Sequence, residues 1–229
     1  MVSSKSLLLA AAGALALPFT STDGRGGSVS ELLTSRAGTP SSEGEHGGFF
    51  YSFWTDGGGT VNYENKDDGS YAVSWQNCSN FVGGKGWSPG TPRTINYESD
   101  FSTTGNGYLA IYGWMKNPLV EYYIIETLGT YDPTVAGPSF GSYEADGSEY
   151  KLTRQLQYPL PTDGLPTPRE TLNRVFAVRQ GQRVAGSVDV GVHFEAWKAA
   201  GLKVGAQHRY QIVATEGYQS SGEAEVTVW

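Results

Sequence analysis

Glu121 stands in a segment that is otherwise aromatic and aliphatic. Residues 119–125 read LVEYYII, so a strand there would place Val120, Tyr122 and Ile124 on one face and Glu121 with Tyr123 on the other. Glutamate is uncommon in strands, and burying a carboxylate is costly unless it is hydrogen-bonded. Such a carboxylate is therefore either paired for structural reasons or used in chemistry.

A second glutamate, Glu216, follows an apolar strand in residues 210–218 (YQIVATEGY) and shares a face with Ala214. Hydrolysis of a glycosidic bond requires two carboxyl groups, one that attacks and one that donates and then withdraws a proton. Tyr hydroxyls can hold the attacking group ionised, and exposed Trp and Tyr rings can stack on sugars. The alternative is a structural pair of strand glutamates satisfied by Tyr or Arg.

The elements that must position these residues are short strands separated by turns. Runs of β-branched and aromatic residues alternate with Asp-Gly turns at about 8–12-residue spacing, which is typical of an antiparallel sandwich or barrel. The predicted strands cover residues 49–54, 59–63, 70–75, 108–114, 120–127, 175–178, 210–215 and 224–229. Only residues 190–200 have a helical pattern. No linker or repeat follows residue 47, so we expect one all-β domain.

The composition favours the same fold class and excludes some partners. The chain has 31 Gly, 14 Tyr and 6 Trp but only 2 Met, which suits strands and turns better than helices. Its net charge of −7 argues against nucleic acid or an anionic membrane as a partner. Cys78 is the single cysteine, so no intrachain disulfide can form. Asn77 begins the only N-x-S/T sequon, and its use remains open.

The first residues resemble a targeting signal. Residues 1–20 combine a polar start carrying Lys5, an apolar run over 7–17 and an Ala-Leu-Ala signature at 14–16, which predicts a secretory signal peptide. The polar stretch 21–46 is interpreted as a pro-segment or disordered lead-in. No other run approaches the roughly 20 apolar residues that cross a bilayer. We expect a secreted, extracellular monomer whose mature domain covers 47–229.

Other reactive residues form no pattern of their own. His46, His193 and His208 lie far apart in the sequence, without the spacing of zinc ligands. Residues 83–86 (GGKG) lack the spacing and the Ser/Thr of a phosphate loop and indicate a strand or turn. No G-x-S-x-G motif supports a serine nucleophile. We therefore expect neither a metal nor a cofactor.

Five segments follow one another along the chain: residues 51–54 (YSFW), 80–87 (NFVGGKGW), 112–114 (YGW), 117–123 (NPLVEYY) and 214–218 (ATEGY). Together they resemble the motifs of glycoside hydrolase family 11, the compact endo-β-1,4-xylanases. The resemblance covers residues 47–229. It implies a jelly-roll sandwich of two curved antiparallel sheets, with one packed helix and a thumb hairpin over a cleft. The implied substrates are xylan and xylo-oligosaccharides.

The resemblance also assigns roles to residues. It implies that Glu121 is the nucleophile and Glu216 the proton donor, with Tyr112 and Tyr123 hydrogen-bonding near the nucleophile. The implied mechanism is retaining, with carboxyl groups about 5–5.5 Å apart and a covalent glycosyl-enzyme intermediate. The remaining substrate-binding residues that it implies are Trp54, which would stack on the sugar, Asn80 beside the acid/base, and Pro161 in the thumb.

The sequence departs from the family pattern around the thumb. The arginine that reaches the cleaved sugar in the family is Gln157 here, unless Arg154 replaces it from a shifted register. A family glutamine that contacts the nucleophile aligns with Arg174. An inward Arg174 would act on the ionisation of both glutamates, whereas a shifted strand would leave it solvated. We favour the outward or rearranged position.

Three functions of different classes are compatible with this sequence. The first is a secreted endo-β-1,4-xylanase. The second is a xylan-binding or elicitor-like protein on the same scaffold, with turnover reduced by the altered thumb. The third is a jelly-roll endoglucanase acting on cellulose or mixed-linkage glucan, which the five motifs disfavour.

Overall fold

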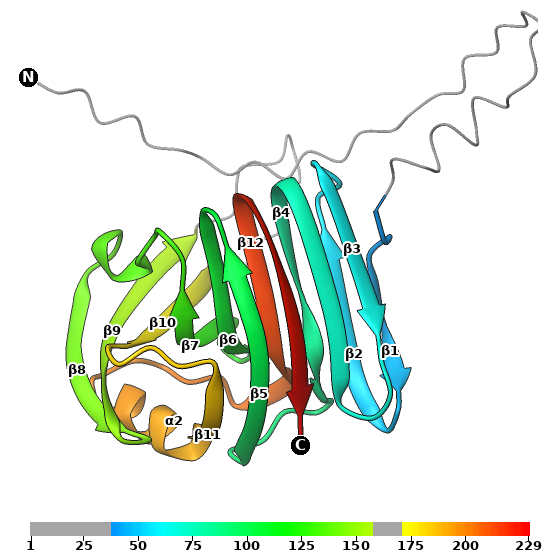
Figure 1. Cartoon of the computed structure of the whole chain (residues 1–229). Helices are drawn as coiled ribbons and strands as arrows, with labels where there is room; N and C mark the ends of the chain where they lie inside the picture. Colours follow the sequence, from blue (N-terminus) through cyan, green and yellow to red (C-terminus); the bar gives the residue numbers. More distant parts are fainter. Residues whose placement is uncertain (1–37, 158–170) are drawn as a thin grey trace, which may run out of the picture. The chain divides into compact units, whose positions relative to one another are not determined.

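The computed structural model describes residues 38–157 and 171–229, which belong to one compact unit (Figure 1). The strands are β1 (Ser42–His46), β2 (Phe49–Thr55), β3 (Thr60–Asn65), β4 (Ser70–Trp87), β5 (Thr94–Thr103), β6 (Asn106–Lys116), β7 (Val120–Leu128), β8 (Ser139–Ala145), β9 (Ser148–Gln157), β10 (Leu172–Arg179), β11 (Ala185–Asp189) and β12 (Gln207–Val228). A 3-10 turn, η1 (Pro133–Val135), and one helix, α2 (Val190–Ala199), complete the described elements. The prediction of an all-β fold with one helix is confirmed.

The strands form two layers because β4 and β12 each run through both. In one layer, here called the outer layer, the first half of β4 pairs with β3 and the second half of β12 pairs with β5. In the other, the inner layer, the second half of β4 pairs with β2 and the first half of β12 pairs with β6. The inner layer continues through β7, β10, β9 and β8. The predicted two sheets are therefore continuous through β4 and β12.

The bends in these two long strands have identifiable causes. Asn77 in β4 has φ +46° and Gln219 in β12 has φ +48°, a left-handed conformation that Asn and a few other residues tolerate. The β4–β12 register also shifts between Ser220 and Gly222. Extra residues in one strand of a pair sharpen the local bend, and strands change layer at such points.

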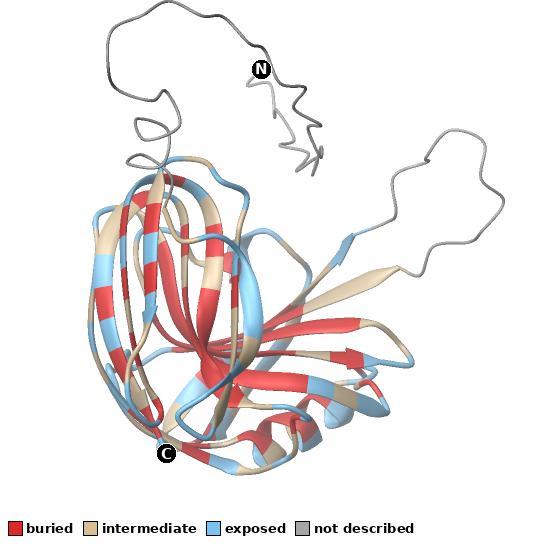
Figure 2. Cartoon of the chain, turned by 90° about the vertical axis from the view of Figure 1, so that its right-hand side faces the viewer, coloured by how far each residue is buried: buried red, intermediate tan, exposed pale blue. Residues whose placement is uncertain are grey.

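The main core lies between the layers. Residues along β3 and the first half of β4 alternate between buried and exposed, as Figure 2 shows by the changing colours along the strands. Helix α2 covers the core side of β7, where the Tyr122 ring meets those of Phe194 and Trp197 at centroid distances of 5.4 and 5.8 Å. Asp189 caps this helix by accepting hydrogen bonds from the backbone N–H groups of Gly191 and Val192. The predicted helix at 190–200 is confirmed.

One strand pair departs from the expected antiparallel pattern. β10 pairs with β7 in parallel, while all other pairs are antiparallel within the described residues. Strands β8, β9 and β10 form an antiparallel meander, and it joins the edge of β7 through β10, the last strand of the three. β10 and β8 therefore both run in the same direction as β7, and β9 runs in the opposite direction.

Residues 42–46, the end of the segment interpreted as a pro-segment or disordered lead-in, are ordered as strand β1. β1 pairs along its whole length with β2, from Ser42 opposite Phe53 to His46 opposite Phe49. Four of its five residues are exposed, so this edge strand has no hydrophobic pattern that could have revealed it. Backbone hydrogen bonds with β2 hold it instead. The predicted signal peptide at residues 1–20 and the predicted thumb residue Pro161 lie outside the described residues.

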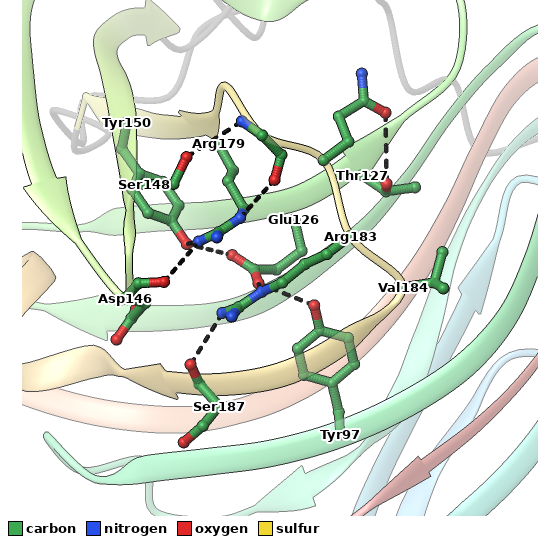
Figure 3. A network of polar contacts seen from close by, with 12 residues as sticks. Tyr97, Glu126, Thr127, Asp146, Ser148, Tyr150, Arg179, Arg183, Val184 and Ser187 are labelled. Atoms are coloured by element: carbon green, nitrogen blue, oxygen red, sulfur yellow. Dashed lines mark hydrogen bonds and ion pairs between the residues drawn. The ribbon is translucent and has the colours of Figure 1, made fainter.

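Another buried glutamate of β7, Glu126, holds the core side of this strand through hydrogen bonds (Figure 3). Its Oε1 accepts a hydrogen bond of 2.5 Å from the Tyr150 hydroxyl. Its Oε2 accepts hydrogen bonds from the Tyr97 hydroxyl at 2.9 Å and from Arg183 Nε at 2.5 Å. Arg183 in turn donates to the carbonyl oxygen of Ser187 in β11. This network ties β11 and the segment before it to the sheet.

Candidate active site

The inner layer has a second cluster of buried side chains, on the face turned away from the main core. We call this the inner face. Strands β6, β7, β10 and β12 supply it, and its buried members are Tyr108, Ala110, Tyr112, Tyr123, Ile125, Phe176, Val178, Tyr210, Ile212 and Ala214. Aromatic rings dominate the end near Glu121: Tyr123 lies 4.8 Å from Tyr112 and 4.9 Å from Phe176, centroid to centroid. The predicted alternation along residues 119–125 places Glu121 on this face.

Glu121 is only 4% exposed, yet both its carboxyl oxygens are hydrogen-bonded. Oε1 accepts from the Tyr112 hydroxyl at 2.9 Å and from the Tyr123 hydroxyl at 3.3 Å. Trp114 Nε1 donates to the Tyr112 oxygen at 2.6 Å and so fixes the direction in which that hydroxyl donates. Because burial and the neighbouring Glu121 charge raise the pKa of both tyrosines well above the ordinary value, both remain protonated donors.

Arg174 donates to the other carboxyl oxygen of Glu121, so the expectation of an outward or rearranged position is wrong. Its Nε lies 2.5 Å from Glu121 Oε2. β10 pairs with β7 without a register shift, and Arg174 stands directly opposite Glu121. Its neighbour Val175 belongs to the main core, so alternation turns Arg174 to the inner face. Although burial lowers the pKa of Arg174, the Glu121 carboxylate and other acidic neighbours raise it above the ordinary value.

Arg154 does not take the place of the arginine that the family carries at Gln157. It pairs with Val175 and therefore lies on the core side of the sheet. Its guanidinium sits 5.1 Å from the centre of the Phe140 ring. Gln157 is exposed at the end of β9. Of Arg154, Gln157 and Arg174, only Arg174 brings a positive charge to the inner face.

Glu216 lies on β12, two strands from Glu121. It is paired with Tyr108 on β6 and with Val82 on β4. Its Oε2 is buried and has no hydrogen-bond partner among the described residues. Burial, and then the negative charge of Glu121, raise the pKa of Glu216 to about 8, against smaller opposing effects of Tyr123 and Arg174. The two carboxyl groups therefore differ at neutral pH, with Glu216 protonated beside an ion-paired Glu121.

Two predicted sugar contacts lie near Glu216. Trp54 is 43% exposed and pairs with Val82, which places its ring in the same cross-strand row as Glu216. Asn80 lies two residues from Val82 on the same face of β4, and its Oδ1 is buried without a partner among the described residues. Pro161, the third predicted contact, lies outside the described residues.

The sequence did not single out two aromatic residues that support the site. Trp114 hydrogen-bonds Tyr112, and Tyr210 packs against Tyr112 and Phe50 with centroid distances of 6.1 and 5.3 Å. For Trp114, the i, i+2 spacing from Tyr112 could have indicated this contact, because it puts both side chains on one face of a strand. In the described part of the chain, no group of His, Cys, Asp and Glu side chains is arranged to hold a metal ion.

Comparison with known proteins shows the family to which the chain belongs. The model of the family described as "Glycosyl hydrolases family 11" matches residues 46–227. An endo-1,4-beta-xylanase 2 from Humicola insolens is 50% identical over 232 residues, covering 100% of this chain and 99% of the relative. An endo-1,4-beta-xylanase from Thermomyces lanuginosus is 48% identical over 96% of this chain and 93% of the relative. An ethylene-inducing xylanase 3 from Verticillium longisporum is 46% identical over 97% of this chain and 75% of the relative. The chain belongs to glycosyl hydrolases family 11.

Proposed function

We propose that the protein is a secreted endo-1,4-β-xylanase that cleaves internal β-1,4-xylosidic bonds of xylan with retention of configuration. One observation carries this proposal: Glu121, held by two tyrosine hydroxyls and a guanidinium, shares a buried face with a protonated Glu216. A retaining glycosidase needs such a pair, an ionised nucleophile and a carboxylic acid with a raised pKa.

In the first step, a carboxylate oxygen of Glu121 attacks the anomeric carbon of the sugar. The bond from that carbon to the leaving oxygen breaks, and the leaving oxygen takes the proton of Glu216. Because burial keeps Glu216 protonated up to about pH 8, the acid is ready at neutral pH. The product of this step is a glycosyl ester on Glu121.

In the second step, water hydrolyses the ester. Glu216, now ionised, accepts a proton from water while the water oxygen forms a bond to the anomeric carbon and the ester bond to Glu121 breaks. Tyr112 and Tyr123 donate hydrogen bonds to the departing carboxylate, which stabilises the charge that returns to it.

The substrate class rests on the relatives and on the exposed ring of Trp54. The three relatives described above are named xylanases. A half-exposed indole beside the acid offers an apolar platform for a sugar ring. Secretion rests on the signal-like residues 1–20. None of the helices described for the chain is long and apolar enough to span a membrane.

The test is product release from linear xylan by the mature protein, with Glu121→Gln measured in parallel. We expect the parent to release short xylo-oligosaccharides with an initially β-configured reducing end, and the variant to release none. An inverted product would contradict the retaining mechanism. Xylan binding without products from the parent would instead indicate a binding protein on this scaffold, and products from cellulose alone an endoglucanase.

A further inference from the structure

Arg174 gives this site a permanent positive charge within hydrogen-bond reach of Glu121. Its side chain is 33% exposed and that of Glu121 is 5% exposed, so their contact is largely protected from water. Only Nε is engaged with Glu121 Oε2, whereas the tyrosines bind Oε1. The carboxylate is thus held from two sides, and its plane is fixed.

The charge of Glu121 changes during the proposed reaction, whereas the positive charge of Arg174 stays constant. In the free protein, the negative charge of Glu121 opposes the ionisation of Glu216, and the positive charge of Arg174 favours it. Once Glu121 is esterified its charge is gone, while that of Arg174 remains. Glu216 then faces a net positive neighbour at the stage where it must be ionised to accept a proton from water.

We propose that Arg174 is a positioning residue in both halves of the reaction: it orients Glu121 for attack and, after esterification, favours the ionised Glu216 that activates water. This inference rests on the proposed function. It concerns a residue at which the chain departs from the family pattern. The guanidinium acts through Glu121 and through its own charge, and neither role needs a contact with the substrate.

The groups that face Glu216 from neighbouring strands support this assignment. β7 contributes Glu121 and Tyr123. Tyr108 and Tyr112 on β6 also interact electrostatically with Glu216. The pKa values of the three tyrosines lie above the ordinary value, chiefly because of burial, so these side chains remain neutral throughout the cycle. Among these side chains around Glu216, Arg174 on β10 supplies the positive charge.

The experiment replaces Arg174 with two neutral residues and one charged residue. Arg174→Gln keeps a hydrogen-bond donor, Arg174→Met keeps only the apolar stem, and Arg174→Lys keeps the charge. Arg93→Gln is the matched control, because Arg93 lies over Trp87 and outside the inner face. Each folded variant is assayed on linear xylan across pH and on an aryl β-xylobioside whose good leaving group makes ester hydrolysis rate-limiting.

For the neutral variants we expect the alkaline limb of kcat/KM to move up by about one pH unit, since a nearby cation shifts a carboxyl pKa by one unit or more. We also expect kcat on the aryl glycoside to fall roughly tenfold, with a glycosyl-enzyme adduct accumulating in intact-mass spectra. Arg174→Lys should retain most of the parental behaviour, and Arg93→Gln all of it.

An unmoved alkaline limb and no added glycosyl-enzyme in a folded neutral variant would overturn the inference. The same conclusion follows if Arg174→Lys behaves like the neutral variants, because then geometry and not charge would be responsible. Failure of the proposed function is seen separately: the parent itself would release no xylo-oligosaccharides.

Discussion

Glu121 and Glu126 lie on the same strand, β7, but their side chains point to opposite faces of the sheet. Glu121 meets Arg174 on the inner face, and Glu126 meets Arg183 in the core. Each carboxylate also accepts hydrogen bonds from two tyrosine hydroxyls. Two chemically similar arrangements five residues apart can therefore be assigned different roles, one in catalysis and one in stability.

The same substitution at these two positions separates the roles. Glu126→Gln should lower the free energy of unfolding by about 3 kcal/mol, because it removes a buried charge that pairs with Arg183 and accepts hydrogen bonds from two tyrosine hydroxyls. The activity per folded molecule should be retained. Glu121→Gln should abolish turnover, because an amide cannot act as the nucleophile. Urea unfolding and a xylan assay on both variants check this pair.

Two results would contradict these assignments. If Glu126→Gln abolished turnover in a protein that unfolds at the parental urea concentration, Glu126 would belong to the reaction and not to the core. If Glu121→Gln kept its activity, the assignment of the nucleophile would be wrong.

Glu216 makes the stability of the protein depend on pH. Its pKa is about 8 in the folded protein and 4.5 ordinarily, so between these values the folded state holds a proton that the unfolded state does not. Stability therefore falls as pH rises from about 4.5 to about 8, as far as this group is concerned. Glu216→Gln has no proton to lose. Its melting temperature relative to the parent should be higher at pH 8.5 than at pH 5, and a constant difference would contradict the raised pKa.

The raised pKa of Glu216 also predicts the alkaline limit of activity. Glu216 must be protonated in the free protein to act as an acid, so kcat/KM should decline above about pH 8. A pH–rate profile on linear xylan measures this limb directly. A decline beginning near pH 5 would show that Glu216 is not protected from ionisation in solution.

Much of the fold could be predicted because its strands carry strong local patterns. The alternation around Glu121 gave both the strand and the face on which each side chain lies. Residues 80–87 were harder, since glycines carry no hydrophobic pattern. They continue β4 by pairing with β2 and β12, and the neighbouring backbone comes so close at Gly84 that a Cβ there would lie 1.9 Å from the carbonyl oxygen of Val213.

The part of the site that sequence could not predict depends on long-range pairing. Whether Arg174 faces Glu121 is decided by the parallel register of β10 with β7, and these residues are 53 positions apart. Local alternation fixes which residues of β10 share a face, but not which face meets the substrate. The edge strand β1 could not be predicted for a related reason, because backbone pairing with β2 and not its side chains holds it in place.

Tyr112 and Tyr123 should differ in their importance to Glu121. The Tyr112 hydrogen bond is shorter, 2.9 against 3.3 Å, and Trp114 Nε1 fixes its direction. Tyr112→Phe removes this donor and leaves the Trp114 N–H without its acceptor. We expect kcat to fall by roughly 100-fold, the usual cost of losing one donor to a developing charge. Tyr123→Phe is the comparison, with a smaller loss expected in the same assay. Equal losses would show that the two donors are equivalent during the reaction.

Trp54 should contribute to substrate affinity and little to stability. Its ring is 43% exposed, so truncating it removes less buried area than a core aromatic would. Trp54→Ala should raise KM for xylo-oligosaccharides several-fold, since stacking on a sugar face is lost, while the melting temperature changes little. Trp75→Ala is the matched comparison: that ring is buried in the main core and donates its Nε1–H to Ser220, so a loss of several kcal/mol in stability is expected there. An unchanged KM in Trp54→Ala would place the bound sugar elsewhere on the inner face.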